Sequence, residues 1–379
     1  MNSPLIVIAN PGRQHSDQLA AALVEQGFRV QYFHGVPVRS SLRALLAGSG
    51  ILRPLGRVIV KMGSKVLPFH TAERLAQATY AVFDRRVARA IRKIHPALVI
   101  AYENSAIASF RAARSVGATT ILDAADVHFT LQNEAATAFR RRINRNKATE
   151  LDLADYVLNC SALARESYLA GGVPADRAKA LPLGVDLTQF VPQTDPAPRA
   201  AIRILFVGRL TRKKGADVLA RALFMLGARG VDFEFRAAAD LDNVEDGMAK
   251  LLAGYGELLG KVTQADLPAL YGWGDIIVVP SRFDSFGLVV YEALACGLPA
   301  LVSDHVGSKD IIVEGVNGHV FPADDNSALA DALATMAADL PALRSKRAAA
   351  RASVEQVGWS DYRRRAGEAV AGILNEARS

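Results

Sequence analysis

The stretch at residues 280–299, PSRFDSFGLVVYEALACGLP, combines the end of a strand, an acid-bearing loop and a helix. The apolar residues 276–279 before it predict a buried strand, and Gly297 and Pro299 end the helix. A helix start offers unpaired N–H groups and the positive end of the helix dipole, which favour a diphosphate. Glu292 lies about one turn into this helix, where its carboxylate can accept hydrogen bonds from ribose hydroxyls. The stretch therefore predicts a nucleotide-binding strand–loop–helix unit.

A second segment, VGRLTRKKG at residues 207–215, repeats the strand-then-loop pattern. Gly208 follows an apolar strand directly, and Arg209 and Lys214 lie in the loop behind it. A guanidinium fork and an ammonium group at this spacing can clamp a pyrophosphate. The same charges would stabilise a departing nucleoside diphosphate.

Outward from these segments, short apolar runs alternate with helical patterns, which predicts parallel sheets covered by helices. A break near 182–186 and the turn-forming residues 192–198 divide the pattern in two. We therefore expect an α/β fold of two doubly wound, Rossmann-like domains facing across a cleft. The expected strands are 5–9, 28–33, 98–102, 119–123, 156–159, 202–207, 233–237, 276–280 and 300–303; the expected helices are 16–26, 217–226, 267–271, 288–296 and 360–375.

The composition narrows the class of protein. Half of the 379 residues are hydrophobic and 22% are charged, which is globular and not disordered. Residues 1–185 hold 24 Lys and Arg against 13 Asp and Glu, so the overall net charge of +7 is concentrated in that half. Cys160 and Cys296 form no disulfide framework, and no signal peptide or membrane span is expected. These features predict a cytoplasmic protein.

At 207–215 and 280–299 the sequence resembles the family-4 type of glycosyltransferase, the retaining enzymes with the GT-B fold. Their pattern has an acid followed by Phe-Gly, with Glu after seven intervening residues, and a Gly-Arg-Leu followed three residues later by Lys-Gly. The resemblance is strong over about residues 150–340 and only in outline before them. It implies an acceptor-side domain at 1–185, to which the helix 359–379 returns, and a donor-binding domain at 186–358.

The resemblance also implies roles for single residues. Glu292 would hold the ribose, Arg209 and Lys214 the diphosphate, and Asp284 the transferred sugar. The amides of Phe286 to Val289 would contact the sugar and the β-phosphate, and the backbone of 260–262 the base. The family usually has Glu at 284 and a Gly-rich segment at 237–242, so this chain departs from it there. The implied donor contacts are Ser285, Phe286, Gly287, Leu288, Val289, Gly208, Lys261 and Val262.

The first half of the chain offers three further candidates. Gly12 follows the first strand, where the family has paired glycines near the donor phosphates, and Arg13 beside it either reaches phosphate or belongs to an ordinary turn. His128 is the counterpart of the family's sugar-contacting His, although no Asp follows it, and a structural role is the alternative. Glu103 ends another strand at the same edge. The acids Asp240 and Asp242 are the nearest approach to a metal site, and we expect no metal or other cofactor.

Residues 37–68 carry a basic, amphipathic pattern. Arg53, Arg57, Lys61 and Lys65 recur every four residues among apolar side chains. Such a helix can lie on an anionic membrane surface. The alternative is an ordinary helix packed on its own sheet with a solvated basic face.

Together these features predict transfer of a hexose-type sugar from a UDP- or GDP-sugar, with retention, to a glycan or lipid-linked acceptor. Bacterial surface polysaccharide or lipopolysaccharide synthesis is the expected setting, in the cytoplasm or on the inner face of the membrane. A sugar-nucleotide epimerase on the same fold and a non-catalytic nucleotide-sugar binder are the alternatives. No basic patch interleaved with aromatic residues indicates nucleic acid.

Overall fold

The computed structural model describes residues 3–12, 14–47, 69–131, 137–193, 200–241, 244 and 247–377. The chain divides into two compact units, residues 1–182 with 360–379, and residues 183–359. Arg13, Asp242 and most of the basic segment 37–68 lie outside the described residues. Within the described ranges, no helix is both long and apolar enough to span a membrane.

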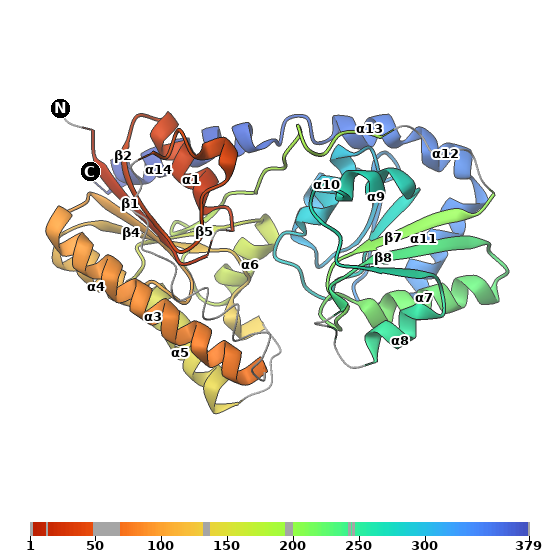
Figure 1. Ribbon diagram of the computed structural model, residues 1–379, viewed down its shortest axis with the longest axis horizontal. Coiled ribbons are helices and arrows are strands. Elements are labelled where there is room, and N and C mark those ends of the chain that lie inside the picture. Colours follow the sequence, from red (N-terminus) through yellow and green to blue (C-terminus); the bar gives the residue numbers. More distant parts are fainter. Residues whose placement is uncertain are drawn as a thin grey trace. The chain divides into compact units, whose positions relative to one another are not determined.

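The first unit is built on a parallel six-stranded sheet of order β2-β1-β3-β4-β5-β6 (Figure 1). The direction of strand order reverses between β1 and β3, so the loops after these strands adjoin at the carboxyl edge of the sheet. The strands are β1 (Leu5–Asn10), β2 (Arg29–His34), β3 (Leu98–Tyr102), β4 (Thr119–Ala124), β5 (Tyr156–Asn159) and β6 (Ala178–Ala180).

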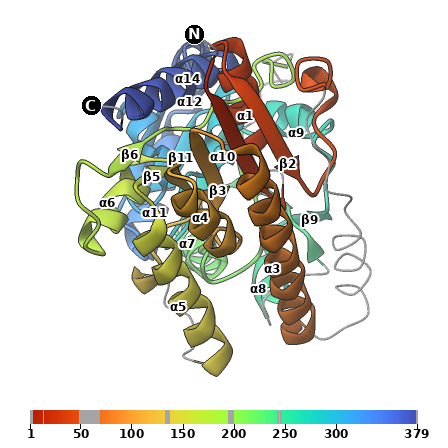
Figure 2. The same ribbon diagram turned by 90° about the vertical axis from the view of Figure 1, so that its left-hand side faces the viewer.

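Helices cover both faces of this sheet. α3, α4 and α5 are neighbours on one face (Figures 1 and 2), where α3 and α4 bury Val87, Ile91 and Phe110 against the strands. The C-terminal helix α14 lies beside α1, because Arg363 donates hydrogen bonds to Gln18 at 3.0 Å and to Glu25 at 2.9 Å. The elements are α1 (Ser16–Glu25), η1 (Ser40–Leu42), α3 (Phe69–Ile94), α4 (Ile107–Ser115), η2 (Phe129–Leu131), α5 (Ala138–Leu153), α6 (Ala162–Ala170) and α14 (Trp359–Glu376).

The second unit repeats the plan with a parallel sheet of order β12-β11-β10-β7-β8-β9. Three strands extend to each side of the junction between β7 and β10, which is the switch point where doubly wound folds bind ligands. The strands are β7 (Ile202–Val207), β8 (Phe233–Ala238), β9 (Glu257–Gly260), β10 (Ile276–Val279), β11 (Ala300–Ser303) and β12 (Gly318–Phe321).

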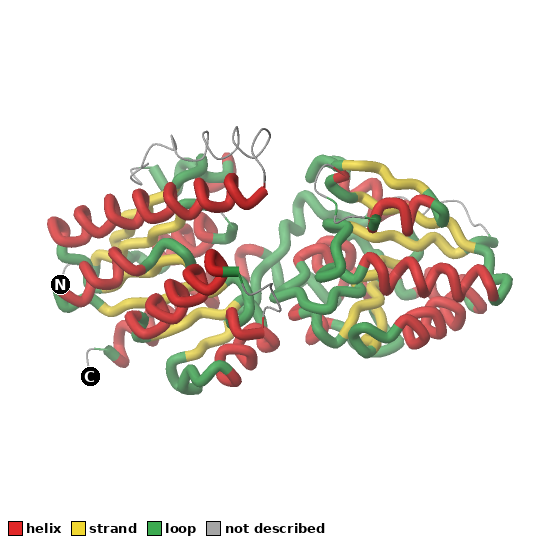
Figure 3. The backbone as a smooth tube through the Cα atoms, turned by 90° about the horizontal axis from the view of Figure 1, so that it is seen from below, coloured by secondary structure: helices red, strands yellow, loops and turns green. Residues whose placement is uncertain are grey.

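The core of the second unit lies between its sheet and the helices α7 and α11, around Ile204, Phe206 and Phe235. Figure 3 shows helices on both sides of the strands in each unit, so the predicted α/β fold with two Rossmann-like sheets is confirmed. The elements are α7 (Ala216–Ala228), α8 (Met248–Ala253), α9 (Leu267–Trp273), α10 (Leu288–Ala295), η4 (Gly307–Ile311), α11 (Asn326–Ala338), α12 (Leu340–Ser345) and α13 (Arg347–Ala352).

Candidate active site

The two signature segments of the sequence meet at the switch point of the second unit. β7 and β10 pair directly, and the loops that follow them lie against each other. The amide of Arg282 donates to the carbonyl of Lys213 at 3.0 Å. Gly215 has a φ of +71°, and a Cβ atom there would lie 1.9 Å from the carbonyl oxygen of Pro280. Only glycine allows this backbone-to-backbone contact, so the loop 208–215 has a fixed position on the loop 280–287.

Lys214 and Asp284 form an ion pair at this junction. The Nζ atom of Lys214 lies 2.5 Å from Oδ2 of Asp284, and the two side chains are 24% and 14% exposed. The backbone of Asp284 is held on both sides, since its amide donates to His305 and its carbonyl accepts from Gly307. The structure thus places an ammonium and a carboxylate together on the strand edge, partly shielded from water and still accessible.

The start of α10 presents open backbone amides beside this pair. Gly287 precedes the helix with a φ of +80°, and a Cβ atom there would lie 2.6 Å from Val306. The ring of Phe286 is buried edge-on against Tyr291, whereas Leu288 and Val289 are half-buried. Among the described residues, no acceptor lies within hydrogen-bonding distance of the amides of Phe286 to Val289. These amides are available to an anionic ligand.

Glu292 lies inside the protein, one turn into α10. It is 5% exposed and accepts a hydrogen bond of 2.8 Å from the hydroxyl of Tyr271, which α9 supplies. Burial raises the pKa of Glu292 to about 7, and the bond from Tyr271 opposes that rise. Burial also raises the pKa of Cys296 to about 12, so this thiol is not a nucleophile.

The remaining donor candidates of the second unit lie around the ends of β7 and β9. Arg209 is exposed, and no acidic side chain in the described part of the chain pairs with it. Gly208 has a φ of +153°. The side chain of Lys261 is 80% exposed, with Nζ 3.7 Å from Asp240. Lys261 and Val262 line an open pocket together with Arg236, Leu259, Thr263, Asp266, Ala269, Leu270 and Trp273.

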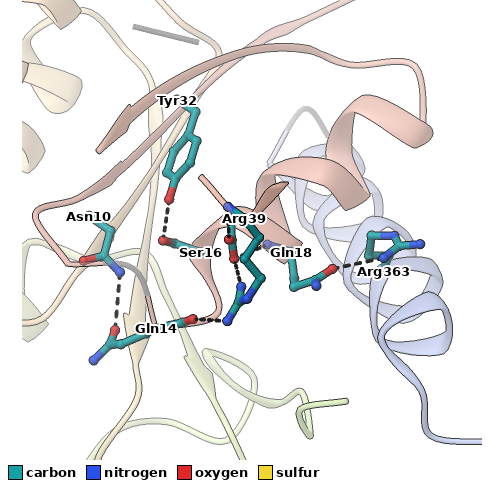
Figure 4. A network of polar contacts seen from close by, with 8 residues as sticks. Asn10, Gln14, Ser16, Gln18, Tyr32, Arg39 and Arg363 are labelled. Atoms are coloured by element: carbon teal, nitrogen blue, oxygen red, sulfur yellow. Dashed lines mark hydrogen bonds and ion pairs between the residues drawn. The ribbon is translucent and has the colours of Figure 1, made fainter. Parts of the chain in front are cut away.

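In the first unit, Gly12 lies in a loop that its own side chains hold in place (Figure 4). Its amide donates to Oδ1 of Asn10 at 2.7 Å, and Nδ2 of Asn10 donates to Gln14 at 3.3 Å. Arg39 donates to the carbonyl of Gln14 at 3.0 Å and pairs with Asp17 at the start of α1. The loop after β1 is therefore ordered by polar contacts that do not involve a ligand.

His128 is packed tightly into the first unit and is 4% exposed. Its ring lies edge-on to Tyr168 and directly over Gly171, where a Cβ atom would come within 2.6 Å of the ring. Nδ1 interacts with the hydroxyl of Thr130 at 2.7 Å. Burial, and then the positive charge of Lys147, lower the pKa of His128, which keeps the ring neutral near pH 7.

Two buried acids stand near the carboxyl edge of the same sheet. Glu103 accepts a hydrogen bond from Tyr168 at 2.9 Å and lies 3.7 Å from Nζ of Lys147. Glu150 accepts from the amides of Asn104 and Ala106, just before α4, and burial raises its pKa to about 8. Because Glu150 satisfies the open amides at a helix start, its role is structural.

The sheet orders and the strand-edge site define the chain as a GT-B protein. Sucrose-phosphate synthase of Thermosynechococcus elongatus aligns with a TM-score of 0.73 and 20% identity, over 99% of this chain and all of that one. HepE of Anabaena, in a complex with UDP, aligns with a TM-score of 0.67 and 16% identity, over 99% of this chain and all of that one. At these identities the likeness concerns the fold.

Sequence comparison gives the family. Residues 201–339 match the family model of glycosyl transferases group 1. The D-inositol 3-phosphate glycosyltransferase of Arthrobacter sp. (strain FB24) is 32% identical over 235 residues, which are 57% of this chain and 56% of that relative. The chain spans about half the length of the curated relatives it matches. Through residues 201–339, the chain belongs to the glycosyl transferases of group 1.

Proposed function

We propose that the protein transfers a hexose-type sugar from a UDP- or GDP-sugar to a glycan or lipid-linked acceptor, with retention at the anomeric carbon. The observation that carries this proposal is the Lys214–Asp284 pair at the switch point, beside the open amides of α10. Membership of group 1 supports sugar transfer, and the UDP complex of HepE, which has the same fold, supports a nucleoside diphosphate. Synthesis of bacterial surface polysaccharide or lipopolysaccharide is the setting that we propose.

Each part of the donor has a proposed partner in the second unit. The base lies against the loop 260–262 after β9, and the ribose hydroxyls donate to Glu292. Arg209 and Lys214 bind the diphosphate together with the amides of Phe286 to Val289. Asp284 contacts the transferred sugar. Because Glu292 is already held by Tyr271, its carboxylate needs no reorganisation before it binds the ribose.

In the proposed reaction, the bond from the anomeric carbon to the phosphate oxygen breaks, and the leaving nucleoside diphosphate keeps the electron pair. Arg209 and Lys214 stabilise the negative charge that grows on it. The acceptor hydroxyl forms the new bond from the same face, and its proton passes to the leaving phosphate oxygen. We propose no metal ion in this step, since the two cations supply the positive charge.

On the acceptor side we propose roles only for the residues that the resemblance indicates. Gly12 and Arg13 belong to the loop after β1, and we assign them to the donor phosphates. We assign His128 to the sugar. Because Nδ1 of His128 is engaged by Thr130, this role falls to Nε2.

We also propose that the protein works on the inner face of the cytoplasmic membrane. The segment 37–68 is mostly undescribed, but a basic surface lies on the described helices of the first unit. Exposed arginines occur on three neighbouring helices: Arg85, Arg89 and Arg92 on α3, Arg111 and Arg114 on α4, and Arg145 on α5. Such charges attract anionic lipid within about 10 Å at physiological salt. We expect salt-sensitive sedimentation with anionic liposomes; equal binding to neutral liposomes, or none at all, would exclude this location.

The test of the donor site is a thermal-shift panel of UDP-, GDP- and ADP-sugars followed by turnover of the best ligand. Product analysis separates the alternatives: an epimerase converts the donor without acceptor and releases no nucleotide, whereas a binder converts nothing. We expect nucleotide release that depends on acceptor. Glu292→Ala should abolish this turnover, and equal turnover by this variant and the parent would refute the assigned site.

A further inference from the structure

Arg282 connects three segments around the donor site. Its guanidinium donates to the carbonyl of Arg212 at 2.7 Å, and to both carboxylate oxygens of Asp217 at 2.6 and 2.9 Å. A further bond of 2.6 Å reaches Asp324. These acceptors belong to the loop after β7, the first turn of α7 and the turn after β12. One side chain thus fixes three chain segments that are separated in sequence.

These contacts bear on the geometry of the Lys214–Asp284 pair. The amide of Arg282 donates to the carbonyl of Lys213, the neighbour of Lys214. Two residues beyond Arg282, Asp284 meets Nζ of Lys214. Arg282 therefore holds the two loops together at the point where they supply the opposite charges of the ion pair.

The charge of Arg282 is already compensated within the protein. Asp217 and Asp324 surround the guanidinium, and its side chain is 25% exposed. Burial tends to raise the pKa of Asp217, but the bonds and charge of Arg282 outweigh this and hold it below its ordinary value. Because its donors are occupied by carboxylates and a carbonyl, Arg282 is not a further phosphate ligand.

We propose that Arg282 is a positioning residue that sets Lys214 and Asp284 at the correct separation to receive the diphosphate of the donor. This inference rests on the proposed function. A planar fork with several donors in fixed directions can satisfy four acceptors at once, and a lysine cannot. Displacement of a binding group by about 1 Å is enough to weaken a pre-organised site strongly.

The second unit contains a matched control. Arg344 forms the same kind of two-bond contact with Asp275, at 2.9 and 3.1 Å, and is 23% exposed. Asp275 directly precedes β10, whereas Arg282 follows it, so the two pairs flank opposite ends of one strand. Loss of either fork removes a similar structural contact, but only Arg282 contacts the loop that carries Lys214.

The experiment compares Arg282→Lys and Arg344→Lys with the parent, using calorimetric titration of the full chain with UDP and UMP, or with GDP and GMP if the parent selects guanine. UMP keeps the base, the ribose and one phosphate. We expect Arg282→Lys to weaken diphosphate binding about tenfold and to leave monophosphate binding within about twofold, so that the ratio of the two affinities falls. Arg344→Lys should keep the ratio while lowering the melting temperature to a similar extent.

A preserved ratio in Arg282→Lys, or an equal fall in Arg344→Lys, would overturn the inference. If Arg282→Lys does not fold, Asp324→Asn is the second variant, because its side chain is 62% exposed and carries only one of the contacts. It should lower the ratio in the same direction by a smaller factor, and an unchanged ratio there would also overturn the inference. A parent that binds no nucleotide at all would instead refute the proposed donor site.

Discussion

The protonation of Glu292 gives the most exacting test of the donor site. Its pKa of about 7, against an ordinary value of 4.5, means that the folded protein binds this proton more tightly than the unfolded chain. The sign follows directly: as pH rises above about 4.5, the unfolded state loses its proton first, so folding stability falls until about pH 7. Between about pH 5 and about pH 8 the loss amounts to about 2.5 kcal/mol.

Glu292→Gln removes this titration and keeps an oxygen that accepts the hydrogen bond from Tyr271. The variant's free energy of unfolding should therefore rise relative to the parent's by about 2.5 kcal/mol between about pH 5 and about pH 8. Both tryptophans, Trp273 and Trp359, belong to the second unit, so urea titrations followed by tryptophan fluorescence report on that unit. Tyr271→Phe should enlarge the pH dependence, because the lost hydrogen bond lowers the pKa of Glu292.

The same titration predicts the pH dependence of nucleotide binding. An ionised carboxylate can accept from both ribose hydroxyls, and a protonated one cannot. From about pH 8 to about pH 6, the dissociation constant of UDP for the parent should rise about tenfold more than that for Glu292→Gln. The comparison with the variant cancels the protonation of UDP itself. A stability difference and an affinity ratio that both stay constant with pH would refute the assignment of Glu292.

Three further predictions concern the neighbouring groups. Gly287→Ala should destabilise the second unit by about 2 kcal/mol and weaken donor binding, because a Cβ at φ +80° meets Val306; Gly254→Ala, with φ −73° and open space around it, is the control in urea unfolding. Turnover should stay within about twofold in excess EDTA, since cations of the protein stabilise the leaving group; loss that Mg²⁺ restores would contradict this. Asp284→Glu should change the preference among donor sugars, measured as relative kcat/KM, more than it changes UDP affinity.

Much of the fold could be predicted because the central strands are continuous apolar runs. β1, β3, β7 and β11 are buried on both faces by helices and therefore have one-letter patterns that point to strands. The prediction omits β6, β9 and β12, which are short and lie towards the edges of the sheets. Residues such as Lys179 and His319 interrupt their apolar pattern, so nothing local distinguishes them from loops.

The candidate site divides in the same way. Asp284, Gly287 and Glu292 lie in one short segment, so their spacing alone indicates a common site. Tyr271 and Arg282 have no such signal. Tyr271 meets Glu292 from another helix, 21 residues away, and Arg282 meets Asp217 across 65 residues. A tyrosine in an apolar helix and an arginine in a loop have many structural roles, and only tertiary contacts identify these two.

The departure at position 284 gains a physical meaning from these contacts. The main chain of Asp284 is tied to His305 and Gly307, so it cannot shift to compensate for a side chain that is about 1.5 Å shorter than the Glu usual in the family. Lys214 meets the shortened carboxylate, and Arg282 fixes the loop from which Lys214 comes. The space released by the missing methylene therefore lies on the side of the carboxylate away from the backbone, where the proposed sugar contact would form. For this reason we attribute sugar preference to position 284, and diphosphate binding to the framework that Arg282 holds in place.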